Sequence, residues 1–279
     1  MNTRKSYSVV LSVAGSDSSG GAGIQADIKT FSALGVYGAT SITAITAQNT
    51  TGVYSQYPLP PEMVYDQIVA VVEDLRPKYV KIGMLSNVDI VEAVAEALGR
   101  YSLKIILDPV IVSSSGHRLL SVEAQEAIKE KLFPMSLLVT PNLPEVSALT
   151  GMPLTTYSEK EDAARYLMDY GAESILIKGG HEEGSLKTDI LYLKSEGKIS
   201  SSLFTSNTVV SKNIHGTGCT LSSAIAAFMA RGSSMADAVA RAKTFVTTAI
   251  EAGADIEIGQ GAGPVNHGFS PLKMIVNGI

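Results

Sequence analysis

The feature that most constrains the fold of this chain is a regular alternation of short valine- and isoleucine-rich runs with segments of helical periodicity. Runs such as 79–82 and 174–177 are typical of buried strands, and the segments between the runs repeat apolar residues every three or four positions. This order predicts right-handed βαβ units. We therefore expect an α/β fold with a mostly parallel central sheet and helices on both of its faces.

The boundaries of the expected elements follow from the same periodicities. Strands are expected at 9–14, 39–47, 79–82, 104–107, 137–139 and 174–177. Helices are expected at 24–34, 64–75, 88–98, 122–132, 143–149, 160–170, 216–230 and 235–250. Residues 189–194 and 202–210, on either side of SEGKIS, predict a hairpin that forms an antiparallel edge of the sheet. No linker, repeat or low-complexity segment interrupts the sequence, so we expect one domain over residues 1–279.

Composition limits the partners of the chain. A net charge of −5 argues against nucleic acid or an anionic membrane as the main partner, because both are usually bound by clustered Lys and Arg. No apolar run approaches the roughly 20 residues that span a bilayer, and the first apolar run is too short for a signal peptide. A single cysteine excludes an internal disulfide. We expect a cytoplasmic protein with a small ligand.

The segment NIHGTGCTLSSAIAAFMA, residues 213–230, predicts a glycine turn that opens a helix. Gly216 and Gly218 stand beside Thr217 and the only cysteine, Cys219. The first N–H groups of a helix lack internal partners and its dipole is positive there, so the turn is suited to bind phosphate. The same field predicts a lowered pKa for Cys219, a candidate base or nucleophile. The alternative is that Cys219 is a small buried apolar residue.

Polar residues and glycines follow most of the expected strands. In an open parallel sheet the loops after the strands form the ligand crevice, so these residues are expected at one edge. They are Gly15, Asp17, residues 20–23, Gln48, Asn49, Gly83, Met84, Asp108, Asn142, Glu145, Lys178, Gly179 and Gly180. For Asp17, Asn49 and Gly83, a role as cap or turn residue is the favoured interpretation.

This set contains the groups that phosphoryl transfer requires. Asp108 and Glu145 can hold Mg²⁺ directly or through water, while Lys178 and the helix start can neutralise phosphate oxygens. The chain has no GxxxxGK[ST] sequence, which excludes a P-loop kinase, and GSDSSGGAG lacks the GxGxxG spacing of a dinucleotide-binding turn. Three histidines lack metal-ligand spacing and are expected to be structural: His181, His215 and His267.

Taken together, the motifs of the chain resemble those of a known family. GSDSSGGAGIQADIKTFSALGVYG, TAQNT, KIGM, DPVIV, TPNLPE, IKGGH, HGTGCTLSSAIAA and GPVNH occur in the order seen in the hydroxymethylpyrimidine/phosphomethylpyrimidine kinases of thiamine biosynthesis, within the ribokinase-like superfamily. The resemblance implies a ribokinase-like fold, a homodimer and the use of Mg·ATP. It also implies phosphorylation of 4-amino-5-hydroxymethyl-2-methylpyrimidine, followed by phosphorylation of the monophosphate at the same site.

The resemblance also assigns roles to individual residues. Cys219 takes the place of the catalytic aspartate of ribokinases, and Gly216, Thr217 and Gly218 form the anion hole. Asn142 and Glu145 match the magnesium and phosphate motif, Asp108 is a second acidic group near the metal, and Lys178 faces the nucleotide phosphates. Gln48 matches the residue that reads the aminopyrimidine ring. The residues implied to line the same pocket are Gly15, Ala22, Asp27, Met84 and Val110.

One departure and two alternatives bear on this prediction. Family members often have Ala-Lys-Ser-Gly where this chain has Ser113-Ser114-Ser115-Gly116, and a missing lysine would weaken the hold on a substrate phosphate in the second step. Pyridoxal kinase is the first alternative, but some pyridoxal-preferring relatives have an apolar residue in place of Gln48. A sensor without catalysis is the second, although it would be expected to lose Cys219, Glu145 or Lys178. The glycine-rich tail 259–268 is interpreted as either a lid or a packing loop.

Overall fold

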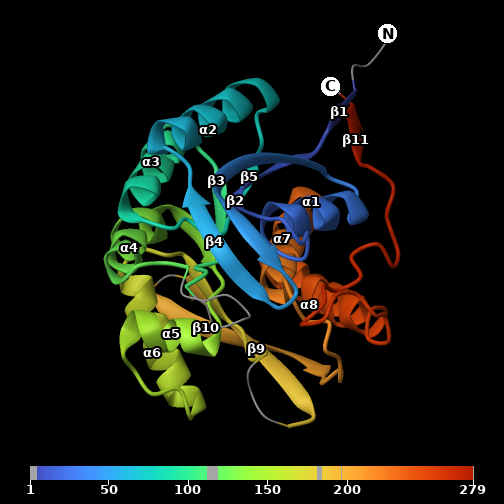
Figure 1. Ribbon diagram of the computed structural model, residues 1–279. Helices are drawn as coiled ribbons and strands as arrows, with labels where there is room; N and C mark the ends of the chain where they lie inside the picture. Colours follow the sequence, from blue (N-terminus) through green and yellow to red (C-terminus); the bar gives the residue numbers. More distant parts are fainter. Residues whose placement is uncertain (1–4, 112–118, 181–183, 196, 279) are drawn as a thin grey trace.

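The computed structural model describes residues 5–111, 119–180, 184–195 and 197–278, so that Ser113 to Gly116 and His181 lie outside the described residues. Within the described ranges, nine strands form one sheet in the order β10-β9-β8-β7-β6-β5-β2-β3-β4 (Figure 1). The strands are β2 Val9–Asp17, β3 Tyr37–Asn49, β4 Gly52–Pro58, β5 Tyr79–Ile82, β6 Lys104–Leu107, β7 Ser136–Val139, β8 Ser174–Ile177, β9 Leu186–Ser195 and β10 Lys198–Asn207.

Six neighbouring strands in this order, β8, β7, β6, β5, β2 and β3, pair in parallel, as the alternation of elements predicts. The predicted strands at 79–82, 104–107 and 174–177 coincide with β5, β6 and β8. The predicted hairpin is present as β9 and β10, and it forms an antiparallel edge beside β8. The sequence did not predict β4, which pairs antiparallel with β3 and makes the opposite edge antiparallel too. Its side chains Tyr54 and Tyr57 are largely exposed, so the segment lacks the apolar run of a buried strand.

Helices cover both faces of the sheet, as predicted (Figure 1). On one face, α2 Pro61–Leu75, α3 Val88–Gly99, α4 Val122–Ala127, α5 Leu143–Thr150 and α6 Tyr157–Asp169 enclose the larger apolar core. On the other face, α1 Gly23–Ala33, α7 Thr217–Ala230 and α8 Met235–Glu251 enclose the second core. The helix α7 has buried residues all around it because it lies between the sheet and α1 and α8. This central position brings its N-terminus to the carboxyl ends of the strands.

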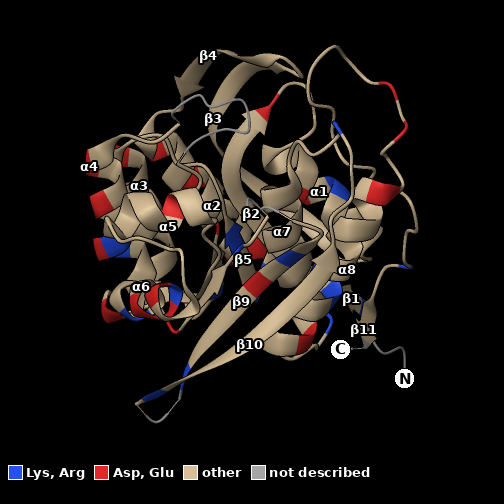
Figure 2. Ribbon diagram, turned by 90° about the horizontal axis from the view of Figure 1, so that it is seen from below, with Lys and Arg blue, Asp and Glu red and all other residues tan. Residues whose placement is uncertain are grey.

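Smaller elements depart from the prediction. The helix expected at 122–132 is α4 followed by a π-helical turn, Ile128–Leu132, and a 3₁₀ turn, Phe133–Met135, which contains a proline that cannot continue an α-helix. The three-residue strands β1 Lys5–Tyr7 and β11 Val276–Gly278 form a separate pair near the two ends of the described chain. None of the described helices has the length and apolar character that a bilayer crossing requires. In Figure 2, Lys and Arg residues are interspersed with Asp and Glu over the outer helices.

Candidate active site

A cavity of about 670 Å³ lies at the carboxyl ends of the parallel strands, where the sequence predicts the ligand crevice. Every residue to which the family resemblance assigns a role, except Asp27, lines this cavity. These residues are Gly15, Ala22, Gln48, Met84, Asp108, Val110, Asn142, Glu145, Lys178, Gly216, Thr217, Gly218 and Cys219. Residues from six strand ends and from the start of α7 therefore converge on one space, although they are spread over more than two hundred positions of the sequence.

The glycine turn before α7 is built by close backbone packing. Gly216 caps the helix with φ of 81°, in the left-handed region, and a Cβ at this position would lie 1.8 Å from the carbonyl oxygen of Gly21. No other residue fits such a contact, so the glycine is required sterically. The turn exposes the first N–H groups of α7, which have no partner within the helix, to the cavity. The residues of the predicted anion hole, Gly216, Thr217 and Gly218, therefore line the cavity.

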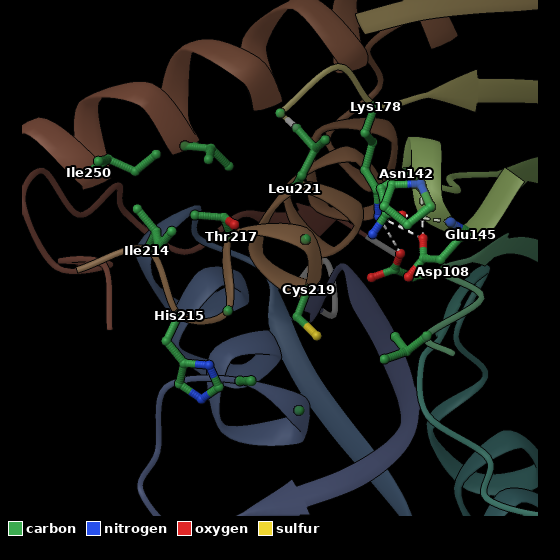
Figure 3. Close-up of a pocket in the computed structure, with 18 of the residues that line it drawn as sticks. Asp108, Asn142, Glu145, Lys178, Ile214, His215, Thr217, Cys219, Leu221 and Ile250 are labelled. Atoms are coloured by element: carbon green, nitrogen blue, oxygen red, sulfur yellow. Dashed lines mark hydrogen bonds and ion pairs between the residues drawn. The ribbon is translucent and has the colours of Figure 1, made fainter. Parts of the chain in front are cut away.

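Two carboxylates and one lysine form a buried group beside this turn (Figure 3). Lys178 Nζ donates to Asp108 Oδ1 at 2.7 Å and lies 3.8 Å from Glu145 Oε2. Burial opposes ionisation of Asp108, but the ammonium groups of Lys178 and Lys81 outweigh it and lower the pKa of Asp108. Burial raises the pKa of Glu145 to about 7, against the opposing effect of Lys178. One carboxylate is thus held ionised beside Lys178, while the other readily takes up a proton.

Asn142 and Glu145 also have a structural role that the sequence analysis missed. The Asn142 side chain accepts from the Glu145 backbone N–H at 2.8 Å, and Glu145 Oε2 accepts from the Asn142 backbone N–H at 2.7 Å. This pair is a capping box, and it fixes the start of α5. The spacing Asn-x-x-Glu before an apolar run is the sequence signal that could have found it. The capping box holds the Glu145 carboxylate at the edge of the cavity, where the backbone N–H of Ile111 also donates to it.

The thiol of Cys219 lies between His215 on one side and the Asp108–Lys178 pair on the other (Figure 3). The cysteine is partly exposed to the cavity, and the backbone N–H of Gly23 donates to its sulfur. Burial nevertheless raises the pKa of this thiol to about 11. The predicted lowering of the pKa is therefore wrong in direction, because desolvation of a thiolate outweighs the favourable field of one helix N-terminus.

Asp27 requires a second correction. Its carboxylate is fully buried beneath the cavity and does not line it. Both of its oxygens accept from Lys81 Nζ at 3.0 Å, and they also accept from Ser12 Oγ at 2.5 Å and Ser223 Oγ at 2.6 Å. With its oxygens turned to these partners, Asp27 is not placed to contact a ligand.

Gln48 lines the cavity and is oriented by neighbouring groups. Its amide nitrogen is 3.2 Å from His215 Nε2, and its amide oxygen accepts from Thr46 Oγ1 at 3.2 Å. His215 Nε2 in turn lies 2.8 Å from Asp17 Oδ2. His215 was expected to be structural, but it lines the cavity and contacts Gln48. Its position directly before Gly216 was the available signal.

Asp17, Asn49 and the glycine-rich tail have structural roles in turns and packing. Asp17 accepts from the backbone N–H groups of Ser19, Gly21 and Ala22, which confirms the interpretation as a cap. Asn49 likewise accepts from the backbone N–H of Thr51. In the tail, Gly261 N donates to Thr50 Oγ1 at 3.1 Å, and Gly263 O accepts from His215 N at 3.0 Å. The tail is therefore packed behind the glycine turn, which favours the packing loop over the lid.

One part of the cavity wall forms an apolar slot. Ile214, Leu221 and Ile250 face it from the loop before α7, from α7 and from α8 (Figure 3). Such a slot next to an anion hole suits a flat base joined to phosphates. Among the described residues, no three acidic, histidine or cysteine side chains form a group that could hold a metal ion by themselves. The two carboxylates around Lys178 instead suit an ion that arrives with a phosphate ligand.

Comparison with solved structures identifies the class of protein. The pyridoxal kinase of Bacillus subtilis, solved as an ADP complex, matches with a TM-score of 0.84 and 35% identity over 94% of this chain and 98% of that one. The pyridoxal kinase of Staphylococcus aureus, also solved with ADP, matches with a TM-score of 0.85 and 32% identity over 98% and 100%. The fold is that of a ribokinase-like kinase.

Sequence comparison identifies the family within this class. The family model described as phosphomethylpyrimidine kinase matches residues 17–266. The hydroxymethylpyrimidine/phosphomethylpyrimidine kinase of Rhizobium meliloti is 47% identical over 93% of this chain and 96% of its own length, and that of Escherichia coli is 46% identical over 92% and 96%. This chain belongs to the phosphomethylpyrimidine kinase family.

Proposed function

We propose that the chain transfers the γ-phosphoryl group of ATP to the hydroxymethyl group of 4-amino-5-hydroxymethyl-2-methylpyrimidine, and then phosphorylates the monophosphate to the diphosphate, in thiamine biosynthesis. The observation that carries this proposal is one cavity lined by Gln48, Cys219 and the Lys178 group, in which Cys219 lies between Lys178 and the His215 ring that Gln48 contacts. Membership of the family supports it. The cytoplasmic location and the homodimer stay predictions of the sequence.

The residues of the site suggest how the transfer proceeds. The N–H groups of the 216–219 turn and the Lys178 ammonium stabilise the negative charge on the transferred phosphoryl group. The substrate oxygen forms its bond to phosphorus as the bond to the ADP oxygen breaks. The hydroxyl proton passes to the thiolate form of Cys219, which becomes a thiol. Asp108 and Glu145 would hold Mg²⁺, directly or through water, and the ion would supply further neutralisation of the phosphate charge.

The direct test is product analysis. The protein is incubated with Mg·ATP and either the hydroxymethylpyrimidine or pyridoxal, and the monophosphate and diphosphate products are separated. We expect the pyrimidine to yield first the monophosphate and then the diphosphate. Turnover of pyridoxal alone would contradict the proposal, and a pyrimidine reaction that stops at the monophosphate would contradict its second step.

Gln48 gives a prediction about specificity. An amide offers a donor and an acceptor, which can pair with the exocyclic amine and the adjacent ring nitrogen of an aminopyrimidine, whereas pyridoxal has no such pair. Gln48→Met should leave these ligand groups unpaired, at a cost of about 1–3 kcal/mol for each, and hardly affect pyridoxal. The ratio of kcat/KM for the two alcohols should therefore shift toward pyridoxal by at least about tenfold.

The matched control is Gln56→Met. Gln56 is also partly buried and donates to Ser86 Oγ at 2.9 Å, but it does not line the cavity. This variant should leave the ratio unchanged. If Gln48→Met changes the ratio by less than about threefold, which is under 1 kcal/mol, Gln48 does not read the ring.

Glu145 gives a prediction about magnesium. Glu145→Gln retains the shape of the side chain, and glutamine also serves at the third position of a capping box, so the start of α5 should be preserved. The lost charge should lower activity and raise the Mg²⁺ concentration for half-maximal rate by about tenfold or more. The chain offers a close control in Glu159→Gln, since Glu159 forms the same capping box with Thr156 at the start of α6, away from the cavity. Equal magnesium dependence in the two variants would refute the role of Glu145.

A further inference from the structure

Beneath the cavity, a fully buried ion pair joins three elements that the mechanism above does not use. Lys81 of β5 donates to both oxygens of Asp27 of α1 at 3.0 Å, and both side chains are 0% exposed. Ser223 of α7 donates to the same carboxylate at 2.6 Å. Burying two charges is costly, and a pair of this kind often stabilises a protein no more than apolar residues of the same size would. Stability alone therefore gives a poor account of the pair.

The helix spacing shows where this pair lies relative to Cys219. Gly23 and Asp27 are four residues apart on α1, and Cys219 and Ser223 are four residues apart on α7, so each couple lies on one face of its helix. The Gly23 N–H donates to the Cys219 sulfur, and the Ser223 hydroxyl donates to Asp27. These are two successive contacts between the same helices. The Lys81–Asp27 pair is therefore about one helical turn, roughly 6 Å, below the thiol.

We propose that Lys81 is a positioning residue for Cys219, whose ammonium, held in place by Asp27, favours the thiolate that accepts the substrate proton. An ammonium has three N–H groups, and in the described contacts Asp27 occupies two of them. A fixed cation at this distance offsets part of the desolvation that disfavours the thiolate. The inference rests on the proposed role of Cys219, but its test requires no substrate.

The surroundings of the thiol define what the test must separate. Among the residues that the structure describes, charged groups act on it from different elements: Lys81 of β5, Asp27 of α1, Asp108 after β6 and Lys178 after β8. The two lysines favour the thiolate and the two carboxylates oppose it. Substitutions of Lys81 and Asp27 should therefore shift the pKa of Cys219 in opposite directions, whereas damage to the packing would shift it in the same direction in both variants.

The experiment measures the rate of Cys219 alkylation by iodoacetamide against pH in the absence of ligands. Because the chain has one cysteine, the reaction reports on this thiol alone. With Lys81→Met, the profile should move to higher pH by about one to two units, the effect of a unit charge about 6 Å away at an effective dielectric constant of about 20. With Asp27→Asn, which removes the carboxylate charge and leaves an amide oxygen to hold Lys81, the profile should move to lower pH. The kcat of Lys81→Met should fall at least about tenfold at neutral pH, with little change in the KM of the alcohol.

Ser223→Ala is the matched control, because it removes a contact to Asp27 without removing a charge. Its alkylation profile should stay within a few tenths of a pH unit of the unmodified protein. Shifts of both charge variants in the same direction, or no shift in either, would overturn the proposal. If Lys81→Met does not fold, Asp27→Asn decides alone: a shift to lower pH supports the proposal, and an unchanged or higher profile refutes it. Failure of the kinase assay with the expected alkylation shifts would count against the function and not against the role of Lys81.

Discussion

Cys219→Ala is expected to lower kcat by about 10²–10⁴-fold, the loss that follows removal of a general base, while the affinity for the alcohol changes by only a few fold. The reason is the place of the thiol, which belongs to the 216–219 turn and lies between His215 and the Asp108–Lys178 pair. The measurement is steady-state kinetics with saturating ATP, together with binding of the alcohol. An alanine variant with near-normal turnover would exclude the base role.

The raised pKa of Cys219 adds a second measurement. Because burial raises the pKa of Cys219 to about 11, the thiolate is scarce at neutral pH. While the pH is below this pKa, each increase of one pH unit raises the thiolate fraction about tenfold. The kcat/KM of the unmodified protein should therefore increase with pH above neutrality. Cys219→Asp would supply a carboxylate that is ionised throughout, so it should be more active than Cys219→Ser and have a flatter profile. A serine variant as active as the aspartate variant would show that no base is needed at this position.

The fold could be predicted in large part because burial leaves a clear periodicity. The strands β5, β6 and β8 are short buried runs made mainly of Val, Ile and Leu, and their boundaries were predicted without error. The strand β4 was missed because an edge strand with Tyr54 and Tyr57 exposed has no such signal. The pair β1 and β11 was missed since each strand is three residues long and its partner lies at the other end of the chain.

The candidate site could be predicted in its location but not in its electrostatics. Residues after parallel strands must meet at one edge, and for this reason Asp108, Glu145 and Lys178 were correctly grouped. The pKa of Cys219 was predicted in the wrong direction because desolvation depends on atoms distant in the sequence. Asp27 was assigned to the cavity by resemblance, and only its pairing with Lys81, 54 positions away, reveals that it lies beneath.

Lys178→Met is the other substitution with a large expected effect. Lys178 Nζ lies 2.7 Å from Asp108 Oδ1 and 3.8 Å from Glu145 Oε2. A Cβ built on Gly218 would lie 3.5 Å from the same Nζ, so the ammonium lies between the carboxylates and the anion hole. Its loss removes a cation from the phosphate site and also leaves the phosphates facing two carboxyl groups that no longer have Lys178 between them and the anion hole. We expect kcat/KM for ATP to fall by at least about 10²–10³-fold.

The same substitution should also change the pH dependence of stability. Asp108 and Glu145 would then be buried without the ammonium that lies close to both, at a cost of about 3–5 kcal/mol at neutral pH. Their pKa values would rise above those of the unfolded chain, so the folded state would bind more protons, and stability would be retained at low pH and lost as the pH rises through the raised values. Urea unfolding of Lys178→Met should therefore show a smaller deficit at pH 5 than at pH 8.

Lys129→Met separates the chemical effect from the cost of losing any buried lysine. Lys129 is 3% exposed, pairs with Glu126 at 2.9 Å and donates to the Leu149 carbonyl at 3.2 Å, but it does not line the cavity. Its replacement should lower the free energy of unfolding while kcat/KM for ATP stays within a few fold. The two variants differ in what the ammonium faces, so equal losses of activity would mean that Lys178 contributes only to folding. A stability deficit of Lys178→Met that is as large at pH 5 as at pH 8 would mean that Lys178 does not compensate the charges of Asp108 and Glu145.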